Sequence, residues 1–132
     1  GFNIADVCKG RVVKKEILKN IDLLLIADED LKNLQDLRQN FSGILLTHSP
    51  SGSTIYYEEN KFETVINKNN FIENLNVLGA GDMFAAVLIY YLINNMEEDL
   101  SNKNNLFEKI KNFIERIHIE TTEILLDYNK EL

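Results

Sequence analysis

The stretch from Asn76 to Leu92, NVLGAGDMFAAVLIYYL, constrains this chain most, because two closely spaced glycines and an acid directly precede a long apolar segment. Gly79 and Gly81 have no Cβ atom, so they can adopt positive φ angles and allow another group to approach the main chain closely. The apolar residues after them recur at the spacing of one buried helix face: Met83, Phe84, Val87, Leu88, Tyr91 and Leu92. We therefore expect a tight turn followed by a helix from Gly81 to about Asn94.

The first turn of such a helix has unpaired N–H groups and a partial positive charge, which together favour a bound anion. Asp82 lies where this turn opens. Two interpretations are open. Asp82 caps the helix, or it accepts a proton from a substrate hydroxyl while the amides of Gly79, Ala80 and Gly81 hold a phosphoryl group during its transfer.

The sequence GAGD, followed by a small and apolar helix, resembles the C-terminal signature of the PfkB family of carbohydrate kinases, which have the ribokinase-like fold. The resemblance implies that Asp82 is the catalytic base and that Gly79, Ala80 and Gly81 form an anion hole. It also implies ATP and Mg²⁺ as the nucleotide and its metal, and a sugar as the acceptor. The family usually has an Asp shortly before GAGD, beside a monovalent cation site. This chain has Asn76 there, which lacks the charge and argues against that cation.

Two further segments resemble the family in the order in which they occur. After the apolar run Asp22–Ala27, matching the family's Asn-x-x-Glu motif places Ala27 at the Asn and Asp30 at the Glu, so Asp30 would be a shorter, indirect metal ligand. Capping of a helix by Asp28 is the alternative. The segment Thr47–Gly52 is similar to the family's Thr-x-Gly-x-x-Gly motif beside the nucleotide. Thr47 and Gly52 match it, whereas Ser49 replaces the first glycine.

Size and charge bound the remaining possibilities. A chain of 132 residues is one domain, and since PfkB kinases are longer, the resemblance implies that residues 1–132 are the C-terminal, nucleotide-side portion of a kinase domain. The net charge of −7 argues against nucleic acid or an acidic membrane as a partner. No apolar run reaches transmembrane length, and the single cysteine, Cys8, cannot form an internal disulfide. We therefore expect a cytoplasmic setting and a structural role for Cys8.

The pattern along the chain predicts an α/β fold of layers, with a mostly parallel sheet, an antiparallel hairpin toward one edge, and flanking helices. The expected helices are Arg11–Asn20, Asp28–Leu37, the segment after the glycine turn, and one or two helices from Leu106 to about Tyr128. The expected strands are Asp22–Ala27, Phe41–Leu46, Thr54–Tyr57 and Phe62–Ile66, with a turn at Thr47–Gly52 and a loop at Glu58–Lys61. His48 and His118 are both expected at the surface.

Three functions are compatible with these residues. The first is an ATP-dependent phosphotransferase that acts on a sugar or a sugar-like alcohol. The second is a nucleotide-binding module without catalysis, which the departures at Ala27, Ser49 and Asn76 favour. The third is a structural α/β domain in which GAGD only begins a helix. The sequence names neither the acceptor, nor the oligomeric state, nor the residues that would contact the adenine.

Overall fold

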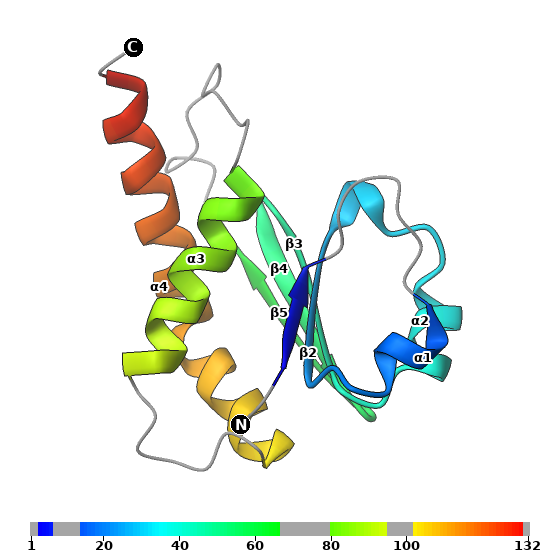
Figure 1. Ribbon diagram of the computed structural model, residues 1–132. Helices are drawn as coiled ribbons and strands as arrows, with labels where there is room; N and C mark the ends of the chain where they lie inside the picture. The colour runs from blue at the N-terminus through cyan, green and yellow to red at the C-terminus, as the bar shows by residue number, and fades with distance from the viewer. Residues whose placement is uncertain (1–2, 7–13, 67–79, 95–101, 131–132) are drawn as a thin grey trace.

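The computed structural model describes residues 3–6, 14–66, 80–94 and 102–130 (Figure 1). The elements in these ranges are β1 (Ile4–Asp6), α1 (Lys15–Leu18), β2 (Leu23–Ala27), the 3-10 helix η1 (Asp28–Asp30), α2 (Leu34–Asn40), β3 (Ile44–Ser49), β4 (Gly52–Tyr57), β5 (Asn60–Val65), α3 (Ala80–Asn94) and α4 (Lys103–Lys130). Cys8 and the connector Asn67–Asn76 lie outside the described residues.

The five strands form one sheet in the order β1-β2-β3-β4-β5. β1, β2 and β3 are parallel, and β4 and β5 continue the sheet as an antiparallel hairpin. In this register Leu25 of β2 lies beside Leu46 of β3, which lies opposite Ile55 of β4. The predicted layout of parallel strands with a hairpin toward one edge is confirmed.

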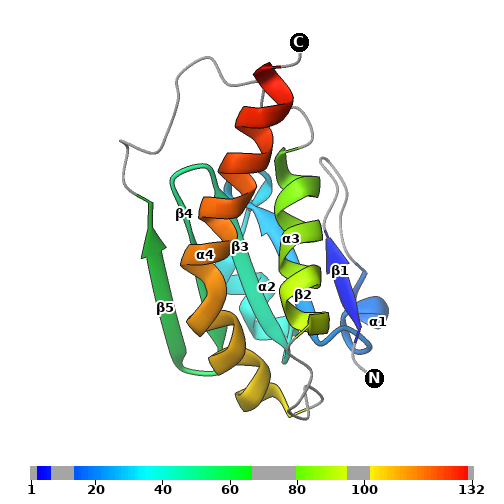
Figure 2. The ribbon, with the colours of Figure 1, turned by 90° about the vertical axis from the view of Figure 1, so that its left-hand side faces the viewer.

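Helices cover both faces of the sheet. Figure 2 shows α3 and α4 side by side over one face, with α2 behind the other. The sequence of β2 is apolar without alternation because both faces of this strand are covered. Leu23 and Leu25 belong to the core under α3 and α4. Leu24 and Ile26 pack with Leu37 of α2 on the opposite face. Burial of each such side chain contributes about 1.5–3 kcal/mol to folding.

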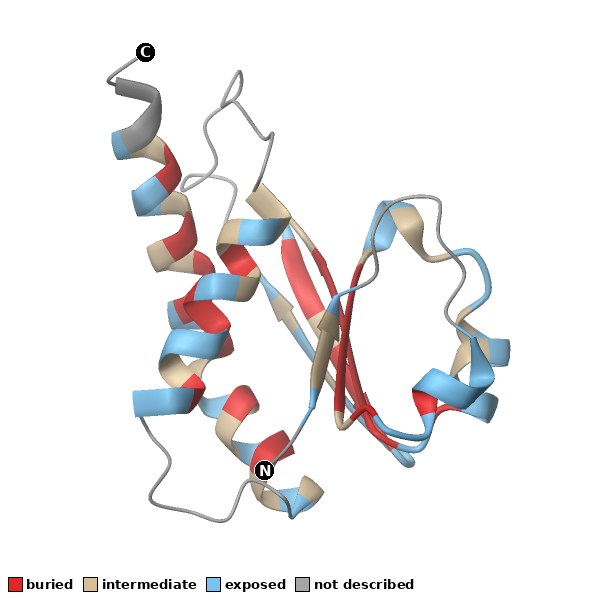
Figure 3. Ribbon diagram, viewed as in Figure 1, coloured by how far each residue is buried: buried red, intermediate tan, exposed pale blue. Residues whose placement is uncertain are grey.

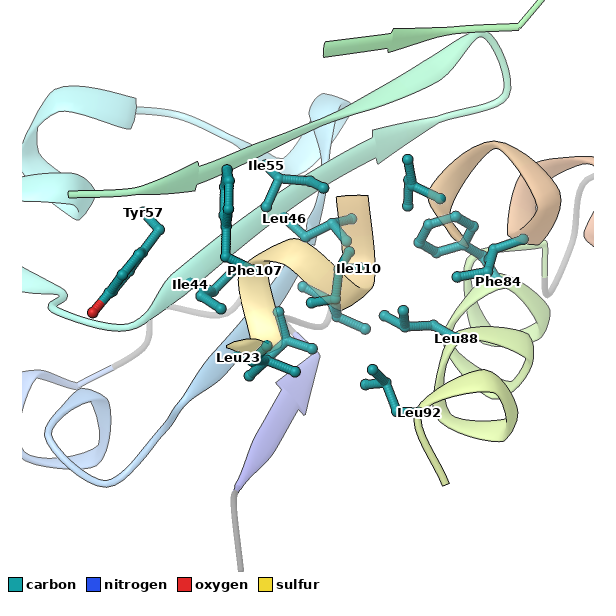
Figure 4. Close-up of a cluster of buried hydrophobic side chains, with 14 of the residues drawn as sticks. Leu23, Ile44, Leu46, Ile55, Tyr57, Phe84, Leu88, Leu92, Phe107 and Ile110 are labelled. Atoms are coloured by element: carbon teal, nitrogen blue, oxygen red, sulfur yellow. The ribbon is translucent and has the colours of Figure 1, made fainter. Parts of the chain in front are cut away.

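The larger core lies between the sheet and the helices α3 and α4. Figure 4 shows side chains of the sheet and of both helices converging there: Leu23, Ile44, Leu46, Ile55, Leu88, Leu92 and Ile110. The helix α4 is one continuous element, and its buried side chains form a stripe along it, shown in red in Figure 3. Tyr91 of α3 makes two contacts with α4. Its hydroxyl donates a hydrogen bond to Glu120 Oε1 at 2.5 Å, and its ring centroid lies 5.4 Å from that of Phe113.

The predicted helix Asp28–Leu37 is wrong, because the chain forms two separate elements there. The short helix η1 ends at Asp30, and Leu31 is extended. The helix α2 then begins at Leu34, where the side chain of Asn33 accepts a hydrogen bond from Asp36 N at 3.0 Å. An Asn that caps a helix competes with a helix continuing through it, and this start signal outweighs the leucine spacing.

The predicted turn Thr47–Gly52 is too long, and so is the predicted loop Glu58–Lys61. β3 continues through Ser49 and β4 begins at Gly52, which leaves only Pro50 and Ser51 between the strands. The second hairpin turns through two residues, Glu58 and Glu59. Polar residues at the end of a strand resemble turn residues in sequence, but here Thr47, His48 and Ser49 pair with β4.

No helix within the described ranges is both long enough and apolar enough to cross a membrane.

Candidate functional site

The candidate site lies where α3 begins, beside the carboxyl ends of β2 and β3 (Figure 1). Ligands of open α/β sheets bind at this end of the parallel strands. The helix α3 begins at Ala80, one residue before the predicted start at Gly81, so Ala80, Gly81 and Asp82 form its first turn, and Asp82 is exposed to solvent. Gly79 and Asn76, which belong to the same predicted turn, lie outside the described residues.

His48 of β3 lies between the end of β2 and the start of α3. Ala27 pairs with His48 in the parallel ladder, and Asp28 and Asp30 of η1 act electrostatically on its imidazole. A Cβ atom at Gly81 would lie 3.5 Å from Cε1 of the same ring. His48 therefore links three segments that the sequence singled out separately: the acidic residues after β2, the end of β3 and the start of α3.

The prediction that His48 is exposed is wrong, since only 7% of the residue is accessible. Its ring stacks on Phe84 of α3, with centroids 4.8 Å apart and planes inclined by 25°. The reason is strand alternation, because Ile44 and Leu46 point into the core under α3 and His48 follows them at the next position on that face. This period-two pattern was the signal in the sequence, and the assignment of a turn at Thr47 concealed it.

The prediction that His118 lies at the surface is also wrong, since only 5% of it is accessible. Its ring lies 4.8 Å from that of Phe84, so Phe84 contacts both imidazoles. His118 follows the buried Ile114 by four residues on α4, the spacing of a common helix face. That spacing could have identified it as buried.

Burial also determines the charge of the two histidines. Desolvation, with a smaller contribution from the electrostatic effect of His48, lowers the pKa of His118 to about 4. Desolvation lowers the pKa of His48 as well, and this effect is opposed by the carboxylates of Asp28 and Asp30. Both imidazoles are therefore predominantly neutral at neutral pH.

Thr47 and Gly52, predicted to bind the nucleotide, occupy different positions relative to the turn. Thr47 is buried and, being next to His48 in β3, its side chain faces the α1 and α2 side of the sheet rather than α3. Gly52 has φ of 146°, and a Cβ atom there would lie 2.0 Å from the carbonyl oxygen of Thr64. The hairpin therefore requires a glycine at this position, whatever its part in binding. Their role toward a nucleotide stays a prediction.

The residues that could hold a metal ion are few in the described ranges. These ranges contain no group of three or more His, Cys, Asp or Glu side chains arranged to bind one. Mg²⁺ at a nucleotide usually keeps several waters and takes one or two carboxylates besides the phosphates. Asp28 and Asp30 of η1 fit that smaller requirement in number and in chemistry, and both act electrostatically on His48.

A separate pocket of about 590 Å³ lies on the other face of the sheet, against α2. The guanidinium of Arg38 lies 4.7 Å from the ring centroid of Tyr56 there, and its Nη2 donates to the carbonyl oxygen of Glu58. The pocket adjoins the start of β3 and the end of β4. It is therefore at the opposite end of β3 from the first turn of α3 and is not part of the candidate site.

No family model matches the sequence, and no curated protein is significantly similar to it. Solved structures do match. A pyrophosphate-dependent myo-inositol-1 kinase, converted by two substitutions into a myo-inositol-3 kinase, is 20% identical with a TM-score of 0.51, over 82% of this chain and 37% of its own. A putative ribokinase II from E. coli in complex with ATP and Mg²⁺ is 11% identical with a TM-score of 0.51, over 86% of this chain and 42% of its own.

These similarities concern the fold. The chain spans about two fifths of the length of the structures it matches. The α/β architecture predicted from the sequence is therefore confirmed: the chain has a partial ribokinase-like fold, with the first turn of α3 at the carboxyl end of the parallel strands.

Proposed function

We propose that this chain is the nucleotide and anion-binding portion of a ribokinase-like kinase, which transfers the γ-phosphoryl group of ATP to a hydroxyl of a sugar or a sugar-like alcohol. The observation that carries the proposal is the exposed carboxylate of Asp82 in the first turn of α3, at the ligand-binding end of the parallel strands. The kinase fold of the similar structures and the GAGD sequence support the same assignment.

In this reaction Asp82 accepts the proton of the acceptor hydroxyl. The hydroxyl oxygen forms a bond to the γ-phosphorus while the bond from that phosphorus to the β-γ bridging oxygen breaks, and ADP leaves with the electron pair. The backbone amides of Gly79, Ala80 and Gly81 stabilise the negative charge on the phosphoryl oxygens. A positioned general base of this kind contributes about 10²- to 10⁴-fold to the rate.

Mg²⁺, when bound, would neutralise charge on the phosphates of the nucleotide. Asp30 would hold it indirectly, through a coordinated water, with Asp28 beside it on η1. In this proposal the chain itself contributes the two carboxylates of η1, which act electrostatically on His48, and the exposed base Asp82.

The second candidate is a nucleotide-binding module without catalysis, which one specific feature favours. Ala27 ends β2 directly before η1, at the position where the family's pattern has an Asn, and a methyl side chain forms no hydrogen bond to a phosphate or a water. Asn76 and Ser49 are the other departures. In this case the first turn of α3 would bind the nucleotide phosphates, and Asp82 would cap the helix.

The intact protein that contains this chain tests the proposal, assayed with Mg²⁺ and a panel of sugars and polyols, with ATP or pyrophosphate as donor. Asp82→Asn removes the base and keeps the shape, so we expect kcat to fall at least about 100-fold with nearly unchanged donor affinity. Asp36→Asn is the matched control, since Asp36 is also an exposed acid in the first turn of a helix, α2. Unchanged turnover in Asp82→Asn would contradict the proposed role.

Calorimetry separates the two candidates. ATP or ADP binding without turnover on any acceptor supports the module, and turnover that depends on Asp82 supports the kinase. If the protein uses pyrophosphate and not ATP, the proposed transfer to a hydroxyl is supported and the proposed donor, ATP, is wrong. If the intact protein binds neither donor, both candidates are wrong.

A further inference from the structure

Three buried side-chain atoms beneath the first turn of α3 have no hydrogen-bond partner in the described part of the protein. They are His48 Nε2, Ser53 Oγ and His118 Nε2. Each residue is at least nine-tenths buried, and they come from three elements, β3, β4 and α4. Buried polar atoms are nearly always paired, so three unpaired atoms in one region need a common explanation.

The register of the sheet places His48 and Ser53 side by side. They are directly opposite each other in the antiparallel pair of β3 and β4, so their side chains leave the sheet on the same face. The preceding pair on that face, Leu46 and Ile55, belongs to the core under α3 and α4. The hydroxyl of Ser53 therefore lies on the same side of the sheet as the His48 ring, inside the core.

Phe84 connects this pair to the helix layer. Its ring centroid lies 4.8 Å from that of His48 and 4.8 Å from that of His118, so both imidazoles pack against one aromatic ring. A Cβ atom added at Gly81, one turn earlier on α3, would lie 3.5 Å from His48 Cε1, the carbon bonded to both ring nitrogens. The residues with unpaired atoms are therefore connected, His48 to Ser53 by the cross-strand pair and His48 to His118 through Phe84.

The hydrogen-bonding capacity of the three groups is complementary to water. Each neutral imidazole has one N–H donor and one acceptor nitrogen, and a hydroxyl is both donor and acceptor. A buried water typically makes about three hydrogen bonds to such groups. The buried hydroxyl of Thr121 on the same helix as His118 shows the contrasting case, since it donates to the carbonyl oxygen of Ile117 at 2.7 Å.

We propose that His48 Nε2, Ser53 Oγ and His118 Nε2 together bind one buried water molecule beneath the first turn of α3. The water pairs all three atoms, fixes the tautomer of each imidazole, and holds the His48 ring in its stacked position on Phe84. This inference concerns the interior of the fold and does not depend on phosphoryl transfer.

The change in urea midpoint caused by Ser53→Ala has one sign if a water is bound between His48, Ser53 and His118 and the opposite sign if it is not. In a dry cluster, Ser53→Ala removes an unsatisfied hydroxyl and raises the urea midpoint. If the water is bound, Ser53→Ala removes one of its partners and lowers the midpoint, and so does His118→Leu. We expect both midpoints to fall, and the double variant to lose less than the sum of the two, because the second change acts on a site already disrupted.

The matched control combines Ser53→Ala with Ile26→Val, a buried change on the opposite face of the sheet, and these two should be additive. Should His118→Leu fail to fold, the wild-type protein still decides the question by NMR. We expect nuclear Overhauser effects between a long-lived water and the ring protons of His48 and His118. A raised midpoint for Ser53→Ala, or histidine rings without a water signal, would overturn the proposal.

Discussion

The imidazole of His48 on β3 stacks on the ring of Phe84 on α3, with centroids 4.8 Å apart. This contact joins the end of a sheet strand to the first turn of the helix that carries Asp82 two residues earlier. The position of the exposed acid therefore depends on a buried aromatic pair.

Phe84→Ala should be strongly destabilising. The side chain is 3% accessible and packs against both His48 and His118, so its removal leaves a cavity lined by two imidazoles. We expect a loss of about 3–5 kcal/mol in the free energy of unfolding, measured by urea denaturation. Tyr90→Ala on the same helix is the control, since Tyr90 is 62% exposed and should change stability by less than about 1 kcal/mol. Equal effects of the two variants would show that Phe84 does not anchor α3.

Stability should fall as the pH is lowered from 7.5 to 5. Because the pKa of His118 is about 4 in the folded protein and near the ordinary histidine value of 6.5 when unfolded, the unfolded chain binds more protons in this window. The contribution of neutral His118 is fully present above pH 6.5 and is lost as the pH falls toward 4. We expect a decrease of about 2 kcal/mol between pH 7.5 and 5 from this residue, with His48 adding an effect of the same sign.

Denaturant titrations at pH 7.5, 6.5, 5.5 and 5 measure that slope. His118→Leu should remove the larger part of it, and the remainder should reflect His48. A slope that is unchanged in His118→Leu would mean that other groups cause the acid sensitivity.

The local sequence was sufficient to predict the strands β2, β4 and β5. The run Leu23–Ala27 is apolar on both faces and of strand length, and β4 and β5 are rich in β-branched and aromatic residues, so the sheet and its hairpin could be predicted. The start of α3 could be recognised from Gly81 and Asp82 and the apolar spacing that follows them. The start of α2 after Asn33 and the end of β3 at Ser49 could not be predicted in this way. The first depends on the hydrogen bond from Asp36 N to the Asn33 side chain, and the second on the pairing of Ser49 with Gly52.

The two histidines show where sequence reasoning was insufficient for the site. His48 lies among Thr, Ser and Pro residues that favour a turn, and its burial depends on Phe84, which is distant in the chain. His118 lies on a helix whose polar and apolar faces meet at that position. Strand alternation and helix spacing indicate which face each histidine lies on, but its burial also requires the packing of α3 and α4 on the sheet, which is a tertiary effect.

Alanine substitutions should separate the two glycines that the sequence assigned to the site. Gly52→Ala should unfold or strongly destabilise the hairpin, because the new Cβ would lie 2.0 Å from a backbone oxygen at a φ of 146°. At Gly81 the nearest atom to a new Cβ is His48 Cε1 at 3.5 Å, an ordinary contact, and alanine favours a helix by up to about 1 kcal/mol. We therefore expect Gly81→Ala to keep its free energy of unfolding, measured by urea denaturation, because the added methyl makes an ordinary contact with His48. A Gly81→Ala variant as unstable as Gly52→Ala would show that the start of α3 does not tolerate a side chain at this position.

Residues 1–132 alone should show little or no kinase activity. The solved kinases that share this fold are more than twice as long as the matched part, since that part is 37% and 42% of their chains. A phosphoryl transfer needs an acceptor held within reach of Asp82, and the proposal assigns the acceptor pocket to chain beyond this portion. The assay compares the isolated chain with the intact protein under identical donor and acceptor concentrations, after circular dichroism has shown that the isolated chain is folded. Robust sugar phosphorylation by the isolated chain would show instead that these residues contain both binding sites.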